Sequence, residues 1–79
     1  MKWLTDRELV VLRRIDKRRI GSYPWKWKTV FYDIDTSQKV SGLVKRLEHK
    51  GAITIGYHSA GSCSFGITRE AEPLVTDAA

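Results

Sequence analysis

The chain has 79 residues, a hydrophobic fraction of 42% and a formal net charge of +5, which predict one small globular domain with an anionic partner. This composition excludes a disordered chain, and no apolar run approaches the roughly 18 residues of a membrane-spanning helix. Cys63 is the single cysteine, which excludes an intrachain disulfide, and with His49 and His58 it makes too small and too scattered a set for a zinc site. We therefore expect a cytoplasmic protein that binds no metal and no cofactor.

Positive charge is concentrated in the first part of the chain. Residues 1–50 hold 13 Lys and Arg against 6 Asp and Glu, whereas residues 51–79 hold 1 against 3. Nucleic acid is the commonest anionic partner of a small basic domain, and an anionic membrane surface is the second.

A first helix is predicted over residues 5–19. Thr5 is the expected N-cap with Glu8 at N3, which is the capping-box pattern, and the apolar residues that follow fall on one broad arc. Val10 lies outside this arc, so it either borders the core or contacts another chain. The basic run over residues 13–19 exceeds what the helix dipole needs, and it therefore serves either phosphate contact or a solvated face.

A second helix is predicted over residues 24–33, with Pro24 at its first position. Trp27, Val30, Phe31 and Ile34 recur at helical spacing and are expected in the core. The opposite side of this helix presents two aromatic residues, which are either covered by Trp3 and Tyr23 or exposed to a partner. These two aromatic residues are Trp25 and Tyr32. With Val10 of the first helix, they form the expected partner surface.

A third helix, the expected recognition helix, is predicted over residues 36–50. Asp35 is the expected N-cap, and Gly51 follows the last periodic residue, where a left-handed conformation is common. The apolar stripe consists of Val40, Leu43, Val44 and Leu47. The opposite face carries small, amide-bearing and basic side chains and no acidic one, which favours contact with DNA.

The position of each side chain on this face predicts its role, because residues at the centre of a recognition helix reach base edges and marginal ones reach phosphates. The expected base-edge residues are Gln38, Ser41, Gly42, Lys45 and His49. The expected phosphate contacts are Ser37, Lys39, Arg46, Arg13, Arg14, Arg18 and Lys28.

After Gly51 the hydrophobic period changes from 3.6 to 2, which predicts a β-hairpin over residues 52–68. The expected contacts of this wing with DNA are His58, Ser59 and Ser62. Pro73 interrupts any helix that continues from Thr68, so only a short C-terminal turn is expected.

The motif V-S-G-L-V-K-R-L-E-H-K-G-A-I from Val40 to Ile53 resembles the recognition helix and first wing strand of the MarR-type regulators. The resemblance extends to L-T-D-R-E-L-V-V-L-R-R-I from Leu4 and to I-T-R-E-A-E-P-L-V from Ile67. It implies an α+β, mostly α, winged helix-turn-helix domain spanning residues 1–79, with three helices followed by a two-stranded wing. The chain departs from the family pattern because it lacks the long flanking helices and carries no arginine in the wing.

These features predict a sequence-selective protein that binds double-stranded DNA, a small transcriptional regulator that places helix 36–50 in the major groove. We expect a homodimer that forms only on DNA, in the cytoplasm and associated with the nucleoid. The alternative is a winged-helix module that modulates a protein complex through its exposed aromatics and wing. An enzyme is not expected, because no nucleophile has a base at readable spacing and no glycine-rich phosphate loop occurs.

Overall fold

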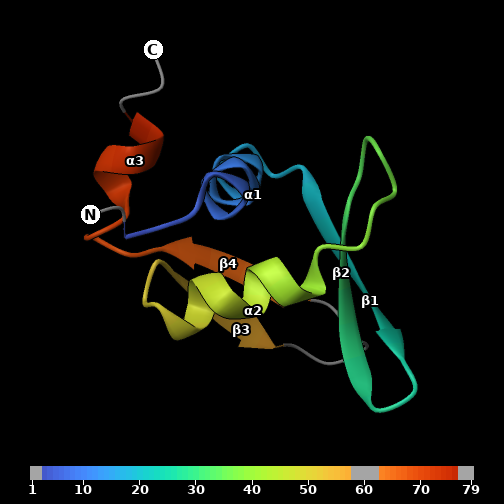
Figure 1. Cartoon of the computed structure of the whole chain (residues 1–79). Helices are drawn as coiled ribbons and strands as arrows, with labels where there is room; N and C mark the ends of the chain where they lie inside the picture. The colour runs from blue at the N-terminus through green and yellow to red at the C-terminus, as the bar shows by residue number, and fades with distance from the viewer. Residues whose placement is uncertain (1–2, 58–62, 77–79) are drawn as a thin grey trace.

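The computed structural model describes residues 3–57 and 63–76, which form helices and hairpins in alternation. The elements are α1 (Asp6–Asp16), β1 (Ile20–Trp25), β2 (Lys28–Asp33), α2 (Ser41–His49), β3 (Ile53–Tyr57), β4 (Cys63–Ile67) and α3 (Glu72–Thr76). The strands form two separate antiparallel sheets, β1 with β2 and β3 with β4 (Figure 1). The prediction of a winged helix with three helices followed by one hairpin is therefore wrong, because a hairpin lies between α1 and α2.

The first helix begins where the sequence predicts. The hydroxyl of Thr5 accepts a hydrogen bond from the Glu8 amide at 3.2 Å, and the Glu8 carboxylate accepts one from the Thr5 amide at 2.8 Å. This reciprocal pair is the capping box, so the predicted cap is confirmed. The helix ends at Asp16 rather than at residue 19, and Arg18 then takes a left-handed conformation with φ of 60° as the chain turns into β1.

The β1–β2 hairpin occupies the segment for which a helix over residues 24–33 was predicted. Trp25 pairs with Lys28, which leaves Lys26 and Trp27 as the turn, and Lys26 has φ of 55°. Strands form here because the segment is rich in aromatic and β-branched residues, which favour the extended backbone. Pro24 is compatible with this structure, since β1 lies at the edge of its sheet.

The change from helix to hairpin also changes which side chains are buried. Phe31 is fully buried as predicted, whereas Trp27 is 98% exposed in the turn and Ile34 is 44% exposed after β2. The predicted burial of Trp27 and Ile34 is therefore wrong. It assumed a helical period of 3.6 residues, and in the hairpin alternate residues face opposite sides.

The chain turns over residues 34–36 and then pairs with the end of β2, so α2 begins at Ser41 instead of residue 36. The Asp33 amide donates to the Gln38 carbonyl at 2.9 Å, and the Val40 amide donates to the Phe31 carbonyl at 2.8 Å. Asp35 is not the N-cap. Val40 occupies that position, and it makes no side-chain hydrogen bond to the helix.

The second hairpin is present where the sequence predicts it. β3 pairs with β4 in a register that sets Ile53 opposite Ile67 and Ile55 opposite Phe65. Gly51 has φ of 81°, which confirms the left-handed conformation expected after the helix. The short α3 accommodates a proline at its second residue because the first turn of a helix needs no amide hydrogen from it.

The core lies between α1, α2 and the inner sides of the two hairpins. The Phe31 ring of β2 and the Phe65 ring of β4 approach to 5.5 Å between centroids, which links the two sheets. The buried apolar side chains are Leu4, Val11, Leu12, Ile15, Ile20, Phe31, Val44, Leu47, Ala52, Ile53 and Ala71. Since α2 buries Val44 and Leu47 in this core, its opposite side faces outward beside the projecting β1–β2 hairpin (Figure 1).

Candidate nucleic-acid interface

A groove of about 730 Å³ lies between the β1–β2 hairpin, α2 and the end of β3, and we call it the α2 groove. It collects residues from three segments that are distant in the sequence. The lining residues are Trp27, Lys28, Thr29, Val30, Ser41, Gly42, Lys45 and Tyr57. None of these residues is acidic, so the groove combines two lysines with two aromatic side chains and carries positive charge.

The outward side of α2 extends this surface. Gly42, Lys45, Arg46 and His49 are all exposed, and their spacing of i, i+3, i+4 and i+7 places them on one stripe. We call these residues the α2 stripe. The part of this face that was predicted from Gly42 to His49 is thus presented to solvent, on a helix that starts later than expected.

Lys45 is held in place by Tyr57 of β3. Its ammonium group lies 2.7 Å from the Tyr57 hydroxyl oxygen and 5.3 Å from the centre of the Tyr57 ring. The hydrogen bond to Tyr57 raises the pKa of Lys45 above its ordinary value, so the side chain stays charged at neutral pH. An ammonium group has three donors, and this contact leaves two of them for a ligand.

Gly42 leaves open space where the α2 groove meets a second hollow beside α1. A Cβ atom built at this position would meet no other atom within 4 Å, so packing within the described structure does not require glycine there. Glycine in a helix costs about 1 kcal/mol relative to alanine. The first turn of α2 also contains no acidic side chain, which leaves this end of the helix open to an anionic group.

A second hollow continues the surface from Gly42 toward α1. It is lined by Arg7 and Arg46 together with Thr5, Asp6 and Leu43. Arg7 was not predicted as a binding residue, and the acidic Asp6 lies beside it. The positive surface therefore runs from Lys28 through Lys45 to Arg46, and it becomes mixed in charge at the start of α1.

Ser41 lies in the α2 groove, but its hydroxyl is already engaged. It accepts a hydrogen bond from the Phe31 amide at 2.9 Å and approaches the Phe31 carbonyl at 3.5 Å. This residue therefore joins the beginning of α2 to β2. A role in positioning the helix accounts for Ser41 better than the predicted contact with a base edge.

Three predicted contacts, Ser37, Gln38 and Lys39, lie on the segment before α2 and not on the helix. Ser37 is exposed with φ of 62°, and Lys39 forms an isolated bridge with Tyr32. Gln38 and Lys39 line a separate hollow between this segment and α1, together with Val10. Gln38 therefore does not occupy the first turn of a recognition helix, because residues 38–40 pair antiparallel with the end of β2.

Arg14 is engaged within the protein. Its guanidinium donates to Asp33 at 2.9 and 3.0 Å and also pairs with Asp35, which Arg19 binds in turn. The guanidinium groups of Arg19 and Arg14 lower the pKa of Asp35 to about 2, and that of Arg14 lowers the pKa of Asp33. This network fixes the end of β2 against α1 and neutralises the basic charge that was predicted to contact phosphate.

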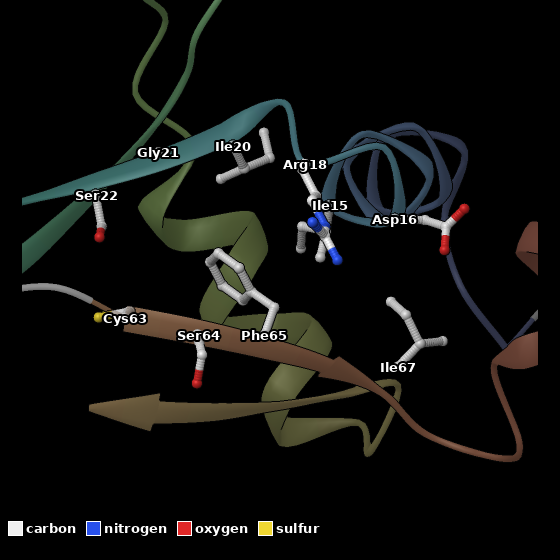
Figure 2. A pocket seen from close by; sticks show the side chains of 10 residues that line it. All are labelled: Ile15, Asp16, Arg18, Ile20, Gly21, Ser22, Cys63, Ser64, Phe65 and Ile67. Atoms are coloured by element: carbon white, nitrogen blue, oxygen red, sulfur yellow. The ribbon is translucent and has the colours of Figure 1, made fainter. Parts of the chain in front are cut away.

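Arg13 and Arg18 lie apart from the α2 groove. The Nε of Arg13 donates to the Leu74 carbonyl of α3 at 3.3 Å. Arg18 lines a hollow of about 600 Å³ between β1 and β4, and Figure 2 shows its side chain and the Phe65 ring pointing into that gap. Cys63 borders the same hollow and is a free thiol.

The predicted partner surface is divided between two parts of the molecule. Val10 is 59% exposed on α1, whereas Trp25 is 58% exposed on the projecting hairpin, where Tyr32 is half-buried. The predicted wing contacts His58, Ser59 and Ser62 lie outside the described residues. Sequence reasoning missed Trp27 and Tyr57 as lining residues, although the alternation of tryptophan and lysine over residues 25–28 was a visible signal.

Comparison with protein-family models, with curated proteins and with solved structures gave no match to this chain. Among the described residues, no helix is long and apolar enough to cross a membrane. In the same part of the chain, no group of three or more His, Cys, Asp and Glu residues could hold a metal ion.

Proposed function

We propose that the protein binds double-stranded DNA, with the α2 stripe facing the major groove and the α2 groove holding backbone phosphates. The observation that carries this proposal is the acid-free α2 groove, in which Lys28 and Lys45 converge from β2 and α2. A polyanion is the ligand that such a surface favours, because each lysine–phosphate contact releases counterions from the DNA.

The dimensions of α2 support this placement. An α-helix with its side chains is about 10 to 12 Å across, which fits the major groove of B-DNA at about 12 Å wide, and the nine residues of α2 give it a length of about 13 Å. His49 then lies near base edges, with Gly42 allowing close approach of the backbone. Lys28 and Lys45 face phosphates in the α2 groove, and Arg46 lies beside the helix where a further phosphate would be. Such a protein would act in the cytoplasm, on the nucleoid.

An interaction with another protein is the second candidate, and the exposure of Trp25 and Val10 favours it. Val10 lines the hollow between α1 and the segment before α2, whereas Trp25 lies on the hairpin. A single partner would therefore have to reach two separated surfaces. The α2 groove presents its charges in one place, which is why we prefer DNA.

The proposal predicts that Lys28 and Lys45 set the salt dependence of binding. Fluorescence anisotropy with a labelled random-sequence duplex, measured across a salt series, gives the slope of log affinity against log salt. The variant that combines Lys28→Ala with Lys45→Ala should lower the magnitude of this slope by roughly two, because each lost phosphate contact lowers it by about one.

Lys17→Ala is the matched control, since Lys17 is an exposed lysine just after α1 and does not line the α2 groove. It should leave the slope unchanged, and thermal unfolding should show that all variants are folded. A slope in the double variant equal to that of wild type would show that the α2 groove is not the DNA site. A slope lowered by about one in Lys17→Ala, which removes one charge instead of two, would show that the effect comes from net charge alone.

A further inference from the structure

We propose that the outer face of the β1–β2 hairpin stacks against unpaired DNA bases, so that the protein binds a duplex with a single-stranded overhang more tightly than a blunt duplex. This inference extends the proposed function and rests on it, because the duplex part of the ligand would occupy the α2 groove. The surface consists of Tyr23, Trp25 and Tyr32, and we call it the aromatic face.

The register of the hairpin places these rings on one side of the sheet. Gly21 pairs with Tyr32, Tyr23 with Val30 and Trp25 with Lys28, and side chains of directly paired residues share a face. Phe31 and Ile20 belong to the opposite face, and both are buried in the core. The outer face thus holds three aromatic residues on a two-stranded platform that projects from the molecule (Figure 1).

Gly21 makes room for one of these rings. A Cβ atom at Gly21 would lie 2.8 Å from Cζ of Tyr32, a separation shorter than side chains tolerate. The Tyr32 ring therefore lies across the backbone of β1 at Gly21. The Tyr23 ring packs beside it with centroids 5.7 Å apart. Glycine at this position allows an aromatic ring to cover the strand, which creates a continuous aromatic surface.

The end of the aromatic face nearest the turn is exposed to solvent, and it adjoins a further exposed tryptophan. Trp25 is 58% exposed and Trp27, in the turn, is 98% exposed. Large apolar side chains gathered on one exposed surface mark a binding site more often than a solvated one. Bases of single-stranded nucleic acid stack on such rings irrespective of sequence, because every base has a flat π-face.

The charges on the hairpin identify the ligand as a polyanion. Residues 21–32 contain two lysines and no acidic residue. Lys26 lies with its ammonium group 5.8 Å from the centre of the Trp25 ring, and Lys28 is exposed directly opposite Trp25 in the register. Aromatic rings interleaved with positive charges match the alternation of bases and phosphates along a single strand.

The hairpin tip connects this face to the duplex site. Trp27 and Lys28 line the α2 groove, and Trp25 is joined to them through the turn. A strand that leaves a duplex at the α2 groove therefore meets the turn first and the aromatic face next. This continuity favours a junction between duplex and single strand over either form alone.

The test compares three labelled DNA ligands by fluorescence anisotropy at fixed salt: a blunt duplex, the same duplex with an overhang of about eight thymidines, and the overhang strand alone. Wild type should bind the overhang duplex at least about fivefold more tightly than the blunt duplex. Trp25→Ala should abolish this preference and leave the affinity for the blunt duplex unchanged, since Trp25 does not line the α2 groove. Trp25→Phe should retain much of the preference, because phenylalanine still stacks.

Trp3→Ala is the matched control, because Trp3 is an exposed tryptophan that precedes α1 and lies outside the hairpin. It should keep the overhang preference, and thermal unfolding should show that each variant is folded. If wild type binds both duplexes equally, or if Trp25→Ala keeps the preference, the aromatic face does not bind bases, although the proposed function stands. If wild type binds none of the three ligands at low salt, the proposed function fails and this inference fails with it.

Discussion

Glu8 is a buried carboxylate that takes part in hydrogen bonds between α1 and the end of α2. It is 0% exposed, and one carboxylate oxygen accepts hydrogen bonds from the Thr5 amide at 2.8 Å and from the Lys50 ammonium at 2.6 Å. Its other oxygen is buried without a hydrogen-bond partner among the described residues. Lys50 also donates to the Trp3 carbonyl at 3.2 Å, so this pair joins the start of α1 to the end of α2. The hydrogen bond from Lys50 lowers the pKa of Glu8.

We expect Lys50→Met to lower the free energy of unfolding at pH 7 by roughly 2 kcal/mol. Loss of one partner of a buried ion pair costs about 3 to 5 kcal/mol, and the partial exposure of Lys50 reduces this value. Urea denaturation of wild type and variant from pH 7 to pH 3 measures the difference.

The difference in stability between wild type and Lys50→Met should depend on pH. In wild type the folded-state pKa of Glu8 is lowered, so its contribution to stability is present above the unfolded pKa and is lost as pH falls through the folded pKa. Lys50→Met removes the largest cause of this lowering, so the folded-state pKa of Glu8 moves back toward its unfolded value. The difference between the two proteins should therefore shrink as pH falls below about 4.5. A difference that stays constant down to pH 3 would show that Glu8 does not titrate with this linkage.

The β1–β2 hairpin could not be predicted from the local sequence pattern. Over residues 24–34 the spacing of Trp27, Val30, Phe31 and Ile34 satisfies a helical period, yet the same segment is rich in residues that favour strands. The decision comes from contacts distant in sequence, such as the bonds of Phe31 to Ser41 and Val40. Periodicity within a short window cannot reveal such partners.

Elements with complete local signals were predicted correctly. The capping box at Thr5 and Glu8, the glycine after α2 and the alternating residues of β3 and β4 each carry their own determinant in adjacent residues. Asp35 had a cap-like pattern as well, but its carboxylate binds Arg14 and Arg19 instead. Backbone pairing of residues 38–40 with β2 and the ion pairs of Asp35 both involve segments outside the predicted helix, so the local sequence carries no sign of them.

Lys26→Gly tests the hairpin as an element. Lys26 holds a positive φ in a two-residue turn, where glycine is favoured, so the substitution should raise the free energy of unfolding by about 0.5 to 1 kcal/mol. In a helix over residues 24–33 the same change would lower it by about 1 kcal/mol. Urea denaturation distinguishes the two signs, and a loss of stability would contradict the hairpin.

Across the whole molecule, some basic residues form ion pairs with carboxylates and others face the α2 groove. Arg14 and Arg19 are neutralised by Asp33 and Asp35, whereas the lysines of the α2 groove face no carboxylate in its lining. The sequence correctly placed positive charge on the outer side of α2. It did not show that β2 and β3 would bring Lys28 and Tyr57 to the same groove, because that arrangement depends on the packing of both hairpins around α2.

Titration of ¹⁵N-labelled protein with a short blunt duplex at low salt, followed by NMR chemical shifts, tests the binding site most directly. We expect saturable shifts that are largest at the amides of Lys28, Gly42, Lys45, Arg46 and Tyr57 and that reverse as salt is added. The amides of α3 and of Val10 should change least. Largest shifts around Val10, or no saturable shift at low salt, would contradict the assignment of the α2 groove as the DNA site.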